Sequence, residues 1–212
     1  MQVGAAAGAV AAGMVLVLDR RVIACGVLLA LTGPAILLAQ LPVPDADSAL
    51  QFTTALAGGS LAPALAGSAA LTSPVVRLRR VDRALVTLSL VTAGAIRGLL
   101  PAAVFDPRAT GCFACPGNLA EVRSDPSLYA DLVHWRLALT IAWGTGLGTR
   151  AVWRWLRAPR IVRLVNAPLV LGGAAIALLA SAAAVHALRL PASEIDTTLR
   201  TWWLALPTKS SK

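Results

Sequence analysis

Two cysteines with the spacing Cys112-x-x-Cys115 are the residues of this chain best suited to covalent chemistry. They lie in a polar segment, residues 105–131 (FDPRATGCFACPGNLAEVRSDPSLYAD), which separates two long apolar runs. The spacing is compatible with a structural disulfide, with a redox-active pair or with half of a metal site. A structural zinc site needs four ligands and only His134 lies nearby, so we expect no metal or other cofactor. No second cysteine pair is present to accept electrons, which favours the structural disulfide over the redox pair.

Arg97 is the second residue with chemical potential, because it lies inside an apolar run about eight residues before the polar segment. A guanidinium at membrane depth is costly unless its side chain reaches the surface, pairs with a carboxylate or faces a water-filled cavity. Asp106 and Asp131 are the nearest carboxylates that could pair with it. Arg97 is therefore a candidate residue for ligand binding or sensing.

The polar segment supplies further candidates. Asn118 follows the cysteines, and residues 118–123 are predicted to form a short helix. Asp125 followed by Pro126 has the pattern of an N-cap and a first helical position. The helix that starts there would place His134 and Arg136 at a membrane interface. We expect ligand contacts or sensing from Arg97, Asp106, Asn118, His134 and Arg136.

Composition indicates which elements hold these residues. The chain is 57% hydrophobic and 14% charged, whereas soluble domains have roughly 45–50% apolar and about 25% charged residues. A membrane-spanning helix needs about 20 mainly apolar residues. The sequence therefore predicts an all-α polytopic helix bundle in a lipid bilayer with about six spans, at residues 3–18, 22–41, 51–72, 84–105, 132–152 and 164–190.

The charges predict the orientation of this bundle. Arginines gather in alternate connections: Arg20, Arg21, Arg77, Arg79, Arg80, Arg83, Arg150, Arg154, Arg157, Arg160 and Arg163. The other connections and the C-terminal region carry Asp45, Asp47, Asp106, Glu121, Asp125, Asp131, Glu194 and Asp196. By the positive-inside rule, the basic connections lie in the cytoplasm, and the N-terminus and residues 105–131 lie outside. This distribution explains the net charge of +9 without a nucleic-acid partner.

The spans form one predicted domain, residues 1–190, and residues 191–212 form a polar or interfacial tail or the start of a seventh span. Gly58-Gly59-Ser60 and Pro63 predict a kink within one span, which helix packing or a ligand site could require. Gly144-Thr-Gly146-Leu-Gly148 has the glycine spacing of a phosphate loop but lies in a span without a preceding strand, so it indicates close helix packing. Cys25 is expected to be a small buried apolar residue.

The sequence resembles the N-terminal membrane region of actinobacterial sensor histidine kinases in the order of several features. These are Phe105-Asp106-Pro107, then Gly111-Cys112-x-x-Cys115-Pro116-x-Asn118-Leu119, then a capping Asp-Pro and a Trp-rich span. The resemblance covers about residues 75–200. It implies an input role for residues 105–131, which we call the outer segment, with Cys112 and Cys115 matching the cysteine pair of that family. The phosphoacceptor histidine motif and the ATP-binding domain are not found in these residues, so kinase activity is not carried over.

Three functions remain open at this point. The leading expectation is a non-enzymatic signal-input module that crosses the plasma membrane several times. It would act on a signalling partner in the membrane or the cytoplasm, and it could self-associate. The alternatives are a membrane thiol-disulfide redox protein that uses Cys112 and Cys115, and a small transporter with a site near Arg97 and the break at residues 58–63.

Overall fold

The computed structural model describes residues 2–17, 23–39, 48–73, 78–107 and 116–189, and within these ranges it contains helices and no strand. This confirms the all-α prediction. Two helices precede the predicted kink, α1 (Gln2–Val17) and α2 (Ile23–Ala39). The others are α3 (Ala49–Gly58), α4 (Ala62–Thr72), α5 (Arg80–Val91), the π-helix η1 (Thr92–Leu99), α6 (Leu100–Val104), α7 (Pro126–Leu156) and α8 (Arg160–Ala187).

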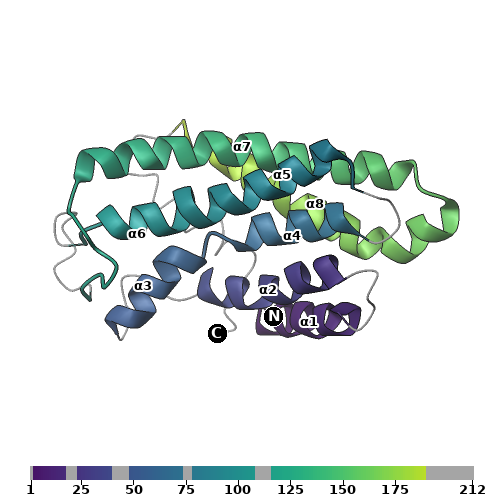
Figure 1. Ribbon diagram of the computed structural model, residues 1–212, viewed down its shortest axis with the longest axis horizontal. Helices are drawn as coiled ribbons and strands as arrows, with labels where there is room; N and C mark the ends of the chain where they lie inside the picture. Colours follow the sequence, from purple (N-terminus) through teal and green to yellow (C-terminus); the bar gives the residue numbers. More distant parts are fainter. Residues whose placement is uncertain (1, 18–22, 40–47, 74–77, 108–115, 190–212) are drawn as a thin grey trace, which may run out of the picture.

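The short helix α4 lies at the centre of the bundle (Figure 1). Every residue from Ala62 to Leu71 is buried, because α2, α7 and α8 all pack against it. The α1–α2 hairpin covers one side, and the continuous rod α5–η1–α6 runs alongside α7 on the other. The start of α5, the end of α7 and the start of α8 therefore meet at one end of the bundle, which we call the basic end. The end of α6 and the start of α7 meet at the opposite end, called the outer end.

Several local predictions are confirmed. The predicted kink is a break, since α3 ends at Gly58 and α4 starts at Ala62 with Pro63 in its first turn. Cys25 is 1% exposed, and its thiol donates to the carbonyl of Ala69 at 3.4 Å. Asp125 caps α7 by accepting from the amide of Leu128, as its sequence pattern indicated.

Two local features differ from the sequence expectation. Residues 118–123 form turns and not a short helix, because Asn118 binds neighbouring helices instead of starting one. The span containing Arg97 is not a uniform α-helix, since Thr92–Leu99 has π-helical hydrogen bonding.

Three helical segments of the described chain are long and apolar enough to cross a membrane: residues 49–72 taken through the break, residues 80–104 and residues 160–187. Residues 6–17 and 23–39 are apolar but shorter. The 31-residue helix α7 lies outside this group. Its sequence includes His134, Arg136 and three glycines, which lower the hydropathy of the segment that was expected to span. The structure thus supports three of the six predicted spans by length and composition.

The glycines of α7 lie at close helix contacts, as predicted: Gly144 and Gly148 face α8, and Gly146 faces Leu85 of α5. A Cβ atom at Gly144 would lie 2.7 Å from the carbonyl oxygen of Ala177 and would also collide with the Ser181 hydroxyl. A Cβ atom at Gly148 would lie 2.6 Å from Leu178 Cγ. The two helix backbones approach closely because these positions lack side chains, which is the usual role of small residues in membrane bundles.

Gly144→Ala should lower the free energy of unfolding by about 1–3 kcal/mol, because the added methyl group overpacks the α7–α8 contact. Gly172→Ala is the matched control, since a Cβ atom at Gly172 meets nothing within 4 Å. That control should stabilise the protein by up to about 1 kcal/mol through its higher helix propensity. Unfolding of both variants in detergent measures the difference, and equal stabilities would contradict the described contact.

Candidate functional site

Asn118 joins the outer segment to two separate helices. Its Nδ2 atom donates to the carbonyl oxygens of Ala102 at 2.6 Å and of Phe105 at 2.8 Å, both at the end of α6. Its Oδ1 atom accepts from the hydroxyl of Thr53 on α3 at 3.3 Å. The backbone amide of Leu119 in turn donates to the Thr53 hydroxyl at 2.9 Å. One amide side chain therefore holds α3, α6 and the outer segment together.

Backbone and aromatic contacts extend this attachment. The amide of Val122 donates to the carbonyl of Ala103 at 2.8 Å. The ring of Phe105 lies between those of Phe52 on α3, at a centroid distance of 6.3 Å, and Tyr129 on α7, at 5.0 Å. The described part of the outer segment, residues 105–107 and 116–131, is thus packed onto α3, α6 and α7.

The start of α7 completes the outer end. The carboxylate of Asp125 accepts from the amide of Leu128 at 3.0 Å and from the hydroxyl of Ser127 at 2.7 Å. These donors hold the pKa of Asp125 below its usual value, because they stabilise the ionised form. The cap is therefore fully charged at neutral pH. It lies at the N-terminus of α7, where the helix dipole favours a negative charge.

The remaining predicted residues fall into separate places. Cys112 and Cys115 lie outside the described residues. Asp106 is half-buried at the outer end, directly after Phe105. His134 is exposed on α7, with its Nδ1 atom 3.0 Å from the carbonyl oxygen of Ala130. Arg97 and Arg136 do come together, since both lie beside Thr140 and the charge of Arg136 acts on Arg97.

Arg97 binds a hydroxyl group and not a carboxylate. Its Nη1 atom donates to Thr140 Oγ1 on α7 at 3.0 Å, and the Thr140 hydroxyl itself donates to the carbonyl of Arg136 at 2.6 Å. Within the described part of the chain Arg97 forms no ion pair, so of the alternatives that the sequence left open, pairing with Asp106 or Asp131 is not the one observed. The reason is geometric: the rod α5–η1–α6 packs along α7, so the nearest acceptor is on the facing helix.

The surroundings of Arg97 contain more donors than acceptors. The Nε atom of Arg97 and the Nε1 atom of Trp143 are both buried without a hydrogen-bond partner. Trp143 lies one helical turn after Thr140 and its side chain is fully buried. Unsatisfied buried polar atoms are rare in native proteins, and they often mark a strained or functional region.

The π-helix that carries Arg97 is in contact with the break between α3 and α4. Gly98 packs directly on the carbonyl of Ala57, leaving no room for a side chain. The hydroxyl of Ser60, within the break, donates to the carbonyl of Ala93 at 3.2 Å. Single-turn π-helices often occur at functional sites or hinges. The two irregular segments of the bundle thus meet at the level of Arg97.

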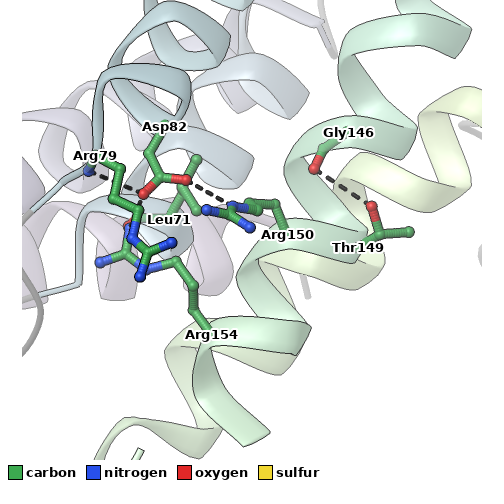
Figure 2. A network of polar contacts seen from close by, with 7 residues as sticks. All are labelled: Leu71, Arg79, Asp82, Gly146, Thr149, Arg150 and Arg154. Carbon is green, nitrogen blue, oxygen red and sulfur yellow. Dashed lines mark hydrogen bonds and ion pairs between the residues drawn. The ribbon is translucent and has the colours of Figure 1, made fainter. Parts of the chain in front are cut away.

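Asp82 organises the opposite, basic end, and sequence reasoning missed it (Figure 2). Its side chain is only 1% exposed and accepts from Arg150 Nε at 2.7 Å and from Arg154 Nη1 at 3.2 Å. It also accepts from the backbone amide of Arg79 at 3.1 Å, at the start of α5. The Nη1 atom of Arg154 reaches further, to the carbonyl of Leu71 at the end of α4, at 3.1 Å. Asp82 therefore joins α5 to α7, and Arg154 extends the link to α4.

A sequence signal for this cluster exists. Asp82 is the single carboxylate within the basic stretch 77–83, and Arg150 and Arg154 are four residues apart and so share one helix face. The positive-inside rule treats the basic stretch as a whole, and so the separate role of Asp82 was overlooked.

No group of three or more His, Cys, Asp or Glu side chains in the described ranges could hold a metal ion. No protein-family model, curated protein or solved structure matches this chain. Any functional argument therefore depends on the contacts described above.

Asp82→Asn should lower the free energy of unfolding by about 3 kcal/mol, because two guanidinium groups lose their buried counter-charge. This is the lower end of the range for such a loss, since the Arg150 side chain stays 24% exposed. Asp131→Asn makes the same chemical change at an exposed position of α7 and should stay within about 0.5 kcal/mol of the wild type. Unfolding in detergent measures both variants, and an Asp82→Asn variant as stable as the control would refute the structural role of the cluster.

Proposed function

We propose that this chain is a multi-pass protein of the plasma membrane that serves as a signal-input module. In this proposal all six apolar segments cross the bilayer, with the N-terminus and the Cys112/Cys115 segment outside and the basic end in the cytoplasm. The outer segment receives the stimulus, and the helices carry its effect across the membrane to a signalling partner. The resemblance to the membrane region of sensor histidine kinases agrees with this role.

Two features support the membrane location. Three helical segments are long and apolar enough to span a bilayer. Large apolar side chains also point away from the bundle along α8, including Ile161, Leu164 and Val165, which are 77%, 69% and 71% exposed. Such a surface is unfavourable in water and matches the lipid-facing side of a membrane helix.

The attachment through Asn118 is the observation that favours an input role. A segment that receives a stimulus can act on the membrane region only if the two are physically connected. Asn118 provides this connection with neutral hydrogen bonds to α3 and α6, each worth about 1 kcal/mol. Bonds of this strength can be exchanged by a modest change in the outer segment.

A route from Asn118 into the membrane region follows from the contacts of α3 and α6. The helix α6 continues directly into η1, and α3 packs on Gly98 through Ala57. A displacement at the outer end therefore acts on the π-helix and on Arg97 from both sides. The π-helix is suited to respond, because the buried Nε atom of Arg97 has no hydrogen-bond partner in the present arrangement and π-helices often occur at hinges.

Asn118→Ala provides a test in lipid nanodiscs by hydrogen–deuterium exchange. Loss of the three side-chain hydrogen bonds to Ala102, Phe105 and Thr53 should speed amide exchange about fivefold or more in residues 100–105, and also in residues 92–99. The control Glu121→Ala removes an exposed side chain from the same segment and should change neither range by more than about twofold. Faster exchange confined to residues 100–105 would show that the outer segment is a static cap, and the input role would be abandoned.

A further inference from the structure

A pocket opens at the basic end, between the end of α4, the last turns of α7 and the first turns of α8. One part of its wall is apolar, formed by residues such as Leu71, Val162 and Val170. The other part is polar, formed by Ser73, Arg154 and Asn166. The wall is therefore amphipathic, as a site for a molecule with a polar and an apolar part would be.

The polar side of the pocket offers hydrogen-bond donors. The side chains of Ser73 and Asn166 make no hydrogen bond with any described residue. Trp155, also in the wall, donates its Nε1 atom to the carbonyl of Arg163 at 2.9 Å. This bond is to the backbone of Arg163. The wall itself carries the hydroxyl of Ser73, the amide of Asn166 and the guanidinium of Arg154, which also binds Asp82, and these groups form a donor set suited to phosphate oxygens.

The charge around the pocket also favours an anion. Residues 78–83 and 150–163 contain eight arginines and only one carboxylate, Asp82. Asp82 is already occupied by Arg150 and Arg154, so it leaves the other arginines of this end uncompensated by any acid in these two stretches. Arg157 and Arg150 both stack on Trp153, at 3.9 and 4.6 Å from the ring centroid, so positive charge is concentrated on the last turns of α7, the helix that forms one side of the pocket.

We propose that this pocket binds the phosphate group of an anionic phospholipid, with the glycerol and upper acyl region against its apolar wall. A lipid is favoured over a soluble phosphate compound because the pocket lies beside the start of α8, a segment apolar enough to cross a bilayer. Basic pockets between membrane helices commonly bind anionic headgroups, and tryptophans such as Trp153 and Trp155 are typical of that interface. The inference requires a membrane location but not the signal-input role.

Asn166→Asp tests the proposal by placing a negative charge in the pocket. Arg80→Gln is the matched control, because it changes the net charge by the same amount at the same end but at an exposed position away from the pocket wall. The full chain is purified in neutral detergent and titrated with dioleoyl phosphatidylglycerol, with dioleoyl phosphatidylcholine or with inorganic phosphate. Retained lipid is measured by native mass spectrometry, and unfolding temperature is recorded in parallel.

The wild type should bind phosphatidylglycerol about tenfold more tightly than phosphatidylcholine, and Asn166→Asp should lose about tenfold in affinity for the anionic lipid. Arg80→Gln should lose no more than about twofold. Equal losses in both variants would show attraction to the whole basic surface and overturn the pocket assignment. Equal binding of both lipids, or stabilisation by inorganic phosphate without retained lipid, would overturn the choice of ligand. If Asn166→Asp does not fold, Ser73→Ala combined with Asn166→Ala replaces it, with the same outcomes.

Discussion

The buried carboxylate of Asp82 is the interaction on which the arrangement of the basic end depends. Removing a charge from water is expensive, and burial is tolerable only when counter-charges and hydrogen bonds replace the lost solvation. Asp82 has both, from Arg150, Arg154 and the amide of Arg79. Because these groups come from α5 and α7, and Arg154 also binds the end of α4, the three helices can meet in only one register at this end.

The two ends of the bundle are therefore stabilised by different kinds of interaction. Charged groups fix the basic end, whereas neutral hydrogen bonds of Asn118 and stacked rings around Phe105 hold the outer end. Between them, α4, which consists mainly of small residues, is buried by α2, α7 and α8, and α7 contacts α8 through glycines. The irregular segments, the α3–α4 break and the π-helix, lie on the outer side of this packed centre. A stimulus at the outer end would thus act on the more adjustable half, against a fixed basic end.

The sequence predicted those features that depend on local pattern. The helical class, the break at residues 58–63, the Asp125 cap and the packing role of the glycines in α7 all follow from residue type and spacing. Features that depend on which helices face each other were not predictable in this way. For Arg97 the sequence left open a side chain that reaches the surface, a carboxylate partner or a water-filled cavity, and none of these names its partner Thr140 on the facing helix.

Asp82 and the lengths of the spans illustrate the same limit. A single acid among arginines looks like a solvated residue until the arginines of α7 are brought next to it. The span expected at residues 132–152 was predicted from the length of an apolar run, whereas α7 lies outside the group of sufficiently apolar helices, because His134 and Arg136 make it less apolar than the others. The pattern of apolar residues does not reveal the π-helix. Its hydrogen bonds are displaced by one residue relative to those of an α-helix, and this changes neither the composition nor the spacing of apolar residues by much.

The proposal that the basic and outer ends lie on opposite sides of a membrane is tested most directly by labelling with a membrane-impermeant maleimide in intact cells. After mild reduction, the native Cys112 and Cys115 should be labelled from outside. In a Cys112→Ser and Cys115→Ser background, Val81→Cys places a thiol at an exposed position of the basic end. That thiol should be labelled only after the cells are permeabilised, and the buried Cys25 should add no background. Labelling of the Val81→Cys protein in intact cells, with no labelling of the native pair, would contradict the account.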